Sequence, residues 1–91
     1  MSDLDGLWSV ERVSGLLPPL IGIRKRIRGD RGETALGRLP GLPFDVEGQR
    51  LRYRGPLRGF VDVLEPDAAG YRGRATFLGR DYGRFVLRRL S

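Results

Sequence analysis

The chain has 91 residues, which is enough for one domain with a single modest hydrophobic core. Its hydrophobic fraction of 40% and charged fraction of 31% are typical of a folded globular protein and exclude a disordered chain. Cysteine and histidine are both absent, which excludes disulfides, thiolate catalysis and any catalysis or metal binding by an imidazole.

The charge balance is basic, with 17 Lys and Arg residues against 11 Asp and Glu residues and a net charge of +6. All of the basic residues except Lys25 are arginines, so the surface is expected to attract anions. No apolar run approaches the roughly 20 residues that span a bilayer. The start of the chain is acidic, whereas a secretory signal starts with basic residues. A cytoplasmic protein without a transmembrane segment is therefore expected.

Glycine and proline divide the chain into short runs in which apolar and polar residues alternate, the pattern of half-buried strands. The first strand is predicted over residues 7–13, with Trp8 and Val10 on its inner side. A second strand is predicted over residues 20–28, and a short third one over residues 34–36.

The clearest element is a hairpin in which residues 44–47 and 50–53 pair across a tight turn at Gly48 and Gln49. This register places apolar residues opposite each other on one face and acidic residues opposite arginines on the other. The predicted pairs are Phe44 with Tyr53, Asp45 with Arg52, Val46 with Leu51, and Glu47 with Arg50. A shift by one residue would break all of these pairs, so the pairing fixes the register.

The same pattern continues downstream as a meander. Loops are predicted at residues 55–57, 66–70 and 80–82. They place Val61 opposite Leu51 on the inner face and Asp62 on the outer face. The predicted inner face consists of Phe44, Val46, Leu51, Tyr53, Val61, Val63, Ala75, Phe77, Phe85 and Leu87. The chain, residues 1–91, is therefore predicted to be one all-β domain, a small antiparallel meander β-barrel of seven or eight short strands.

Two short motifs lie at opposite ends of this meander. Gly6-Leu7-Trp8, at the entry to the first strand, resembles the Gly-x-Trp motif of the calycins, the superfamily of lipocalins and fatty-acid-binding proteins. Asp81-Tyr82-Gly83-Arg84-Phe85 resembles the second lipocalin motif, an Asp-Tyr turn followed by an aromatic residue. In that family a basic residue near the end of the barrel packs over the Trp, and Arg89 is the residue here that is similar to it. The resemblance implies a calycin-like barrel closed by Gly6, Trp8, Asp81, Tyr82 and Arg89.

A non-catalytic binding protein is the predicted function. Without His or Cys, catalysis would depend on carboxylates, Lys or Tyr, and pairing with arginines on the outer face explains most of the carboxylates. Small residues on the inner face leave room for one ligand. The candidate ligand-binding residues are polar-ended side chains in or near the inner register: Lys25, Tyr53, Tyr71 and Arg89. An apolar interior with one or two cations suits a small amphipathic or anionic ligand, and no cofactor or metal is expected. Alternatively, Lys25 and Arg89 merely seal the barrel ends.

The outward-facing arginines predict an alternative function. They lie on three predicted strands and are Arg24, Arg26, Arg28, Arg50, Arg52, Arg54, Arg72 and Arg74. Such a face can contact the phosphates of a nucleic acid or another polyanion. Phe60 is the only aromatic residue predicted to face outward, whereas nucleic-acid-binding sheets use several for base stacking, which favours the interior site. A further alternative is a protein-interaction or homo-oligomeric module, because an incomplete barrel has edge strands to cover.

Overall fold

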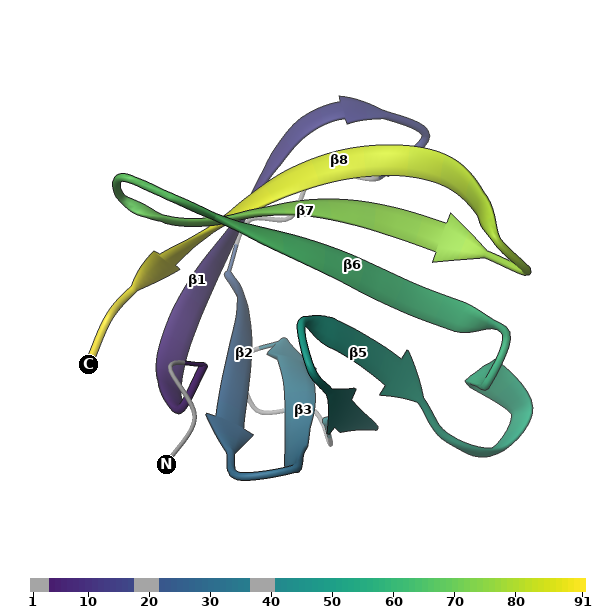
Figure 1. The fold of residues 1–91 in the computed structure, drawn as a ribbon, viewed down its shortest axis with the longest axis horizontal. Coiled ribbons are helices and arrows are strands. Elements are labelled where there is room, and N and C mark those ends of the chain that lie inside the picture. The colour runs from purple at the N-terminus through teal and green to yellow at the C-terminus, as the bar shows by residue number, and fades with distance from the viewer. Residues whose placement is uncertain (1–3, 18–21, 37–40) are drawn as a thin grey trace.

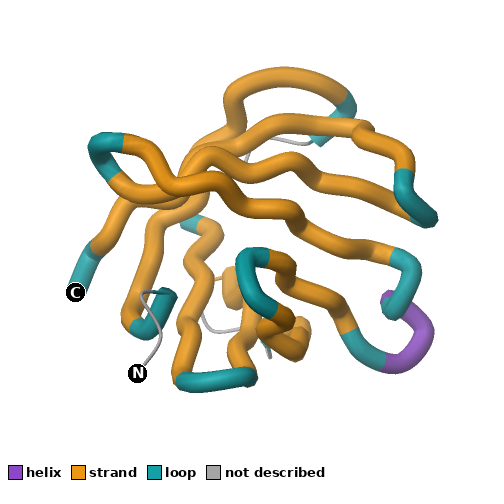
Figure 2. Tube along the Cα trace, in the orientation of Figure 1, coloured by secondary structure: helices purple, strands orange, loops and turns teal. Residues whose placement is uncertain are grey.

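Within the described residues, 4–17, 22–36 and 41–91, eight antiparallel strands form a closed barrel in the computed structural model of the chain (Figure 1). The strands are β1 (Gly6–Gly15), β2 (Ile23–Arg28), β3 (Arg31–Leu36), β4 (Leu42–Glu47), β5 (Arg50–Tyr53), β6 (Phe60–Asp67), β7 (Gly70–Phe77) and β8 (Arg80–Arg89). A short 3-10 helix, η1 (Gly55–Leu57), lies between β5 and β6 (Figure 2). The prediction of a small all-β meander barrel is confirmed. No helix in the described part of the chain is long and apolar enough to cross a membrane.

The barrel closes because β1 pairs with β8 along most of its length. Trp8 lies opposite Arg89 in this ladder, and Val10 lies opposite Leu87. Figure 1 shows these two strands, the purple one and the yellow one, side by side. Every strand therefore has two hydrogen-bonded neighbours, which removes the unpaired edges on which the expectation of self-association rested.

The strands predicted near the N-terminus are present. Trp8 and Val10 are buried on β1, as predicted. The first part of the second predicted strand, residues 20–21, lies outside the described residues, and β2 begins at Ile23. From there β2 alternates as expected, with its arginines exposed and with Lys25 facing the interior.

The β4–β5 hairpin has the predicted register at every position. Gly48 opens its turn with a φ of 64°, a conformation that a residue without a Cβ adopts at no steric cost. The predicted opposite charges do meet, but diagonally and not directly across the strands. Arg52 pairs with Glu47, and Arg54 pairs with Asp45.

The register between β5 and β6 differs from the prediction by one residue. Leu51 lies opposite Asp62, where Val61 was expected. The prediction is wrong because the connection that contains η1 is longer than the predicted loop, and a slip of one residue exchanges the two faces of a strand. Asp62 and Leu64 are therefore buried, whereas Val61 and Val63 lie on the outer face.

The two C-terminal hairpins turn more tightly than predicted. Residues 68–69 join β6 to β7, where a loop over 66–70 was expected. Residues 78–79 join β7 to β8, where the turn was expected at 80–82. The predicted positions of both loops, and the pairing they imply, are therefore wrong, although β7 keeps its predicted inner face as far as Ala75.

Two phenylalanines at the rim of the barrel differ from the prediction. Phe60, expected outside, lines the pocket and packs edge-on against Tyr82. Phe77, its partner on β7, was expected inside but is 44% exposed. The two rings remain in contact, with their centres 4.6 Å apart. Beside them Tyr82 is an extra residue on β8, between the pairs Ala75–Gly83 and Thr76–Asp81.

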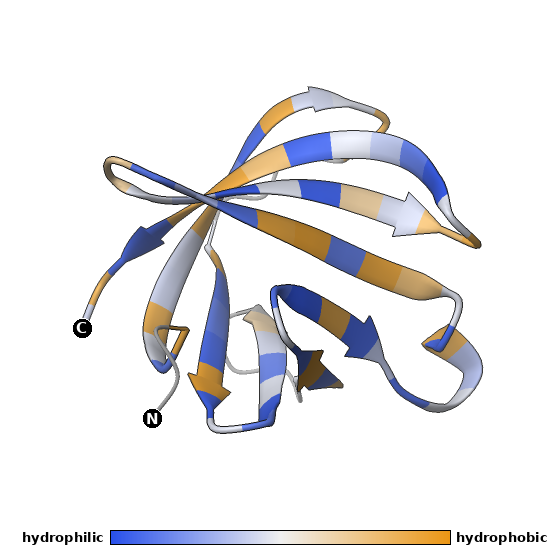
Figure 3. Ribbon diagram, in the orientation of Figure 1, coloured by the Kyte–Doolittle hydropathy of each residue, from blue (hydrophilic) through white to orange (hydrophobic). Residues whose placement is uncertain are grey.

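The core fills the end of the barrel where β1 begins and β8 ends. Its buried apolar residues are Leu4, Trp8, Val10, Ile27, Phe44, Leu51, Leu64, Tyr71, Ala75, Phe85 and Leu87. Figure 3 shows how hydrophilic and hydrophobic residues alternate along β5, where Leu51 is buried and the arginines on either side of it are exposed. The packed end leaves the opposite end of the barrel as the place where the interior is open.

Candidate ligand-binding pocket

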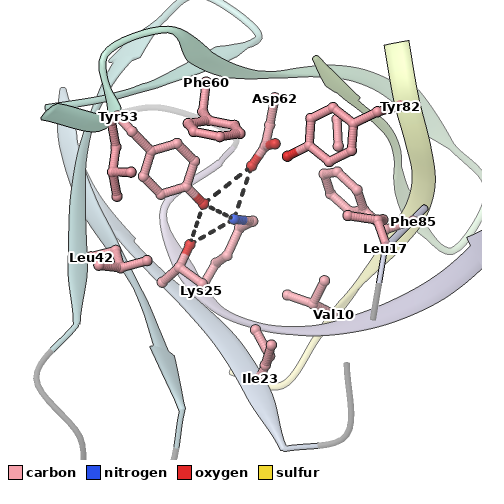
Figure 4. Close-up of a pocket in the computed structure, with 13 residues that line it drawn as sticks. Val10, Leu17, Ile23, Lys25, Leu42, Tyr53, Phe60, Asp62, Tyr82 and Phe85 are labelled. Atoms are coloured by element: carbon pink, nitrogen blue, oxygen red, sulfur yellow. Dashed lines mark hydrogen bonds and ion pairs between the residues drawn. The ribbon is translucent and has the colours of Figure 1, made fainter. Parts of the chain in front are cut away.

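A pocket of about 260 Å³ occupies the interior at the end opposite Trp8. Every strand of the barrel contributes to its wall (Figure 4). The apolar part of the wall consists of Val10, Leu17, Ile23, Leu42, Leu57, Phe60, Ala75 and Phe85, and the polar part of Lys25, Thr34, Tyr53, Asp62 and Tyr82. The pocket is thus a mainly apolar space with its polar groups gathered on one side.

Lys25, the only lysine of the chain, lies at the centre of the polar group and is 3% exposed. Its Nζ atom lies 3.0 Å from Oδ2 of Asp62 and donates hydrogen bonds of 2.7 Å to the Thr34 hydroxyl and 2.7 Å to the Tyr53 hydroxyl. An ammonium group has three N–H donors, and these three acceptors use all of them. Lys25 therefore has no donor left for a ligand.

Aromatic rings surround the same ammonium. Nζ lies 5.3 Å from the ring centres of Phe44 and Tyr53 and 5.8 Å from that of Phe85. Burial lowers the pKa of Lys25, but the Asp62 carboxylate and Tyr53 outweigh this effect and hold the pKa above its ordinary value. The side chain is consequently a charged, fully paired ammonium at neutral pH.

Tyr53 links the cluster together. Its hydroxyl lies 2.6 Å from the Thr34 hydroxyl and donates to Oδ2 of Asp62 at 3.4 Å. Burial raises the pKa of Tyr53, the charge of Lys25 opposes that rise, and the charge of Asp62 adds to it. The phenol therefore stays protonated well above neutral pH and acts as a donor within the cluster.

Two polar atoms of the pocket remain available to a ligand. Oδ1 of Asp62 has no partner among the described residues, and no fully buried side-chain polar atom in that part of the chain lacks one, so Oδ1 is open to the pocket. The Tyr82 hydroxyl also makes no hydrogen bond within the described residues, and Figure 4 shows it directed to the same side as Asp62. Burial, together with the charge of Asp62, raises the pKa of Tyr82, which keeps its proton in place.

The four predicted ligand-binding residues divide into two pairs. Lys25 and Tyr53 line the pocket. Tyr71 is buried at the packed end, where its ring meets that of Trp8 edge-on at 5.5 Å. Arg89 lies at the same end and does not reach the pocket.

Sequence reasoning missed three polar residues of the pocket: Thr34, Asp62 and Tyr82. One signal could have identified Asp62. The inward register of Lys25 requires a buried counter-charge, and Asp62 is the acidic residue with two apolar residues before it and two after it in a predicted strand.

The residues predicted to close the barrel lie at both of its ends. The Arg89 guanidinium lies 4.2 Å from the ring centre of Trp8 and donates a hydrogen bond of 2.7 Å to the Asp5 carbonyl. Gly6 lies beneath it at a φ of 136°, and a Cβ there would approach the Ser91 carbonyl oxygen to 2.6 Å, so only glycine fits. In the β1–β8 ladder Arg89 lies directly opposite Trp8.

Asp81 and Tyr82 lie at the other end of β8. Asp81 faces outward and pairs with Arg74 and Arg84, and Tyr82 lines the pocket. These two residues therefore do not take part in closing the packed end around Trp8.

The predicted polyanion face is divided between two opposite walls of the barrel. Arg24, Arg26 and Arg28 lie on β2, while Arg50, Arg52, Arg54, Arg72 and Arg74 lie on or beside β5 and β7. Most of them have a carboxylate partner: Arg26 with Glu33, Arg52 with Glu47, Arg54 with Asp45, Arg72 with Glu65, and Arg74 with Asp81. Arg24, Arg28 and Arg50 have none among the described residues.

Comparison of the chain with models of protein families, with curated proteins and with solved structures finds no significant match.

Proposed function

We propose that this chain is a calycin-like binding protein that holds one small amphipathic molecule in its pocket and catalyses no reaction. The observation that carries the proposal is an apolar pocket inside a closed barrel, with one carboxylate oxygen and one hydroxyl available to a ligand. Sites of this composition bind through their apolar walls and orient the ligand through the few polar groups.

The size of the pocket sets the size of the ligand. An engineered cavity of about 150 Å³ in another protein accepts benzene. At a similar volume per atom, the pocket of about 260 Å³ accepts a molecule of roughly ten non-hydrogen atoms. A short alkyl chain or a substituted ring with one polar end has this size.

The charges of the pocket favour a ligand whose polar end is uncharged. The charge of Lys25 is already matched by Asp62, and all three of its N–H groups are used. A ligand carboxylate would find no free donor on Lys25 and would face the negative Oδ1 of Asp62. A hydroxyl can instead donate to Oδ1, so the amphipathic ligand is better described as an alcohol or phenol than as a fatty-acid anion.

The same contacts argue against catalysis by the pocket. Lys25 would need a free lone pair to act as a nucleophile, and its ion pair with Asp62 keeps it protonated. Tyr53 would need to lose its proton to act as a base, and burial raises its pKa. The cluster is therefore suited to orienting a bound ligand and not to transferring protons to it or from it.

Two features of the packed end support the resemblance to the calycins. Trp8 of the Gly6-Leu7-Trp8 motif is buried at the end of the barrel where the first and last strands meet. Arg89 stacks over its indole ring, in the role that the family gives to a basic residue. The resemblance adds a reason to expect a ligand at the opposite end.

Calorimetric titration with octanol and octanoate tests the proposal, because the two ligands share an alkyl chain and differ in charge. We expect the protein to bind octanol at least roughly tenfold more tightly than octanoate. Asp62→Asn leaves Lys25 without its counter-charge and should reverse this preference. Failure of both ligands to bind, or a preference of the unmodified protein for octanoate, would contradict the proposal.

A matched control separates the pocket from the overall charge. Glu65 lies on β6, like Asp62, but faces solvent and pairs with Arg72. Glu65→Gln changes the net charge by the same amount as Asp62→Asn and should leave the preference for octanol unchanged. A reversal in both variants would assign the effect to the net charge of the protein.

A further inference from the structure

A second cavity lies on the outer surface of the barrel, over β5, β6 and β7. This groove has a volume of about 730 Å³ and lies on the opposite face of the sheet from the pocket. Arginines and apolar side chains share its lining: Arg50, Arg52, Arg58, Arg74, Val61, Val63, Phe77 and Leu78. Val61 and Val63 reach this surface because they face outward on β6, and Phe77 and Leu78 reach it beside the turn between β7 and β8.

The groove carries a positive charge. Arg52 and Arg74 are each paired with a carboxylate, while the guanidinium groups of Arg50 and Arg58 have no hydrogen-bond or ion-pair partner among the described residues. Asp81 is the one acidic residue in the lining, and its two oxygens already accept hydrogen bonds from Arg74 at 3.2 and 3.3 Å. Two unpaired guanidinium groups are therefore available to an anion from outside.

The β7–β8 hairpin at the side of the groove has an unusual backbone conformation and exposed apolar side chains. Leu78 has a φ of 51°, the left-handed conformation that favours Gly or Asn, and it is 75% exposed. Its amide donates to the Gly59 carbonyl at 2.9 Å, which holds the turn beside the groove. Phe77 next to it is 44% exposed. Phe77 packs against Phe60, with the ring centres 4.6 Å apart, yet nearly half of its side chain stays exposed, and Leu78 beside it is more exposed still. Part of the Phe77 ring and the Leu78 side chain are therefore accessible to a ligand in the groove.

We propose that this groove binds single-stranded nucleic acid. Arg50 and Arg58 provide guanidinium groups for phosphates, and Phe77 provides an exposed ring on which a base can stack, with Leu78 beside it. Binding of single strands combines these two features, since every base has a flat face and every nucleotide has a charge. An acidic peptide would use the arginines but would gain nothing from the exposed ring, so the aromatic residue favours the nucleic acid. This site is separate from the interior pocket and does not depend on its ligand.

Fluorescence anisotropy with a labelled oligodeoxythymidine at several salt concentrations tests the proposal. Each phosphate contact on a single strand contributes about 0.7 to the slope of log affinity against log salt. Arg50→Gln combined with Arg58→Gln should therefore lower the slope by about 1.4 and weaken binding at least roughly tenfold at low salt. Phe77→Ala should weaken binding about tenfold with the slope unchanged, and Phe77→Tyr should restore it.

Arg24→Gln combined with Arg28→Gln is the matched control. Both residues are exposed on β2, on the far wall of the barrel, and neither has an ion-pair partner among the described residues. The control removes the same charge and should leave the slope unchanged. An equal loss in both double variants would show diffuse attraction in place of a site, and binding of polyglutamate with the same dependence on Phe77 would assign the groove to acidic peptides. Either result would overturn the proposal.

Discussion

The two ends of the barrel each hold a cation against aromatic rings, but they use it differently. At the packed end the Arg89 guanidinium lies flat over Trp8, remains partly in contact with solvent and donates to a backbone carbonyl. At the pocket end the Lys25 ammonium is almost fully buried, and a carboxylate and two hydroxyls use all of its donors. The first cation covers the core, while the second organises a cavity.

The choice of side chain follows from this difference. A guanidinium is planar, weakly hydrated and suited to stacking on an indole, whereas an ammonium is a compact donor that three acceptors can surround. In a chain whose other basic residues are all arginines, the single lysine lies where such a compact group is required. Whether a basic position holds lysine or arginine therefore indicates its surroundings better than the positive charge alone does.

Trp8→Ala should have the largest effect on stability. Trp8 is 1% exposed, contacts Tyr71 edge-on, supports Arg89 and donates a hydrogen bond of 2.8 Å to the Leu4 carbonyl. Loss of the indole should lower the free energy of unfolding by about 3–5 kcal/mol, as measured by urea denaturation followed by circular dichroism. Val13→Ala, at an exposed position of the same strand, should stay within about 0.5 kcal/mol of the unmodified protein. Similar losses in the two variants would show that Trp8 does not anchor the packed end.

Asp62→Leu should have the next largest effect, because it leaves Lys25 buried without its counter-charge. We expect a loss of about 3 kcal/mol in the free energy of unfolding. Addition of Lys25→Met should recover most of that loss, since replacing both partners of a buried ion pair by apolar residues is often neutral or stabilising. If the double variant were less stable than Asp62→Leu alone, the two side chains would not form the pair described here.

Alkaline pH should destabilise the pocket end before the packed end. The pKa values of Lys25 and Tyr53 are both raised in the folded state, so above about pH 10 the unfolded chain loses protons that the folded chain keeps. Stability should be independent of these groups below about pH 10, and it should then fall by up to about 1.4 kcal/mol per pH unit for each group. Urea denaturation at a series of pH values measures this, and Tyr53→Phe should make the decline shallower. A decline of equal steepness in that variant would contradict the contribution of Tyr53.

Arg89→Met should have the smallest effect. The methionine keeps part of the packing over Trp8 and loses the charge and the hydrogen bond to the Asp5 carbonyl. A partly exposed cation over an indole contributes about 1 kcal/mol, which is the expected loss in the free energy of unfolding. Arg88→Met, beside it on β8 and 4.0 Å from its carboxylate partner, should cost less. The reverse order would show that stacking on Trp8 contributes nothing.

The sequence predicts the fold and two of the five polar residues of the pocket, for reasons that differ between strands. In the β4–β5 hairpin every cross-strand pair agrees in chemistry, so one register satisfies all of them. In β6 both faces are apolar apart from Asp62, with Val61 and Val63 on one and Phe60 and Leu64 on the other. A register that places Asp62 outside is therefore the simplest prediction for β6. It is wrong because the ion pair with Lys25 makes the inside position of Asp62 favourable.

The end of β7 could not be predicted from alternation at all. The extra residue on β8 beside Thr76 leaves no mark in the hydrophobic pattern, and the Leu78-Gly79 turn has Leu where a tight hairpin usually has Asn or Asp before the glycine. The same region forms the side of the outer groove. Sequence patterns therefore failed where the molecule departs from simple packing rules.

The state of the Lys25 ammonium tests most directly whether the pocket is internally neutralised. Because the chain contains one lysine, labelling with nitrogen-15 lysine gives a single side-chain signal in an NMR spectrum. The paired state predicts a protonated ammonium whose protons exchange slowly with water and whose titration lies above the ordinary pKa of about 10.4. Asp62→Asn should speed the exchange of those protons and lower the pKa. A signal with the exchange rate and pKa of an exposed lysine in the unmodified protein would contradict the pairing and, with it, the preference for an uncharged ligand.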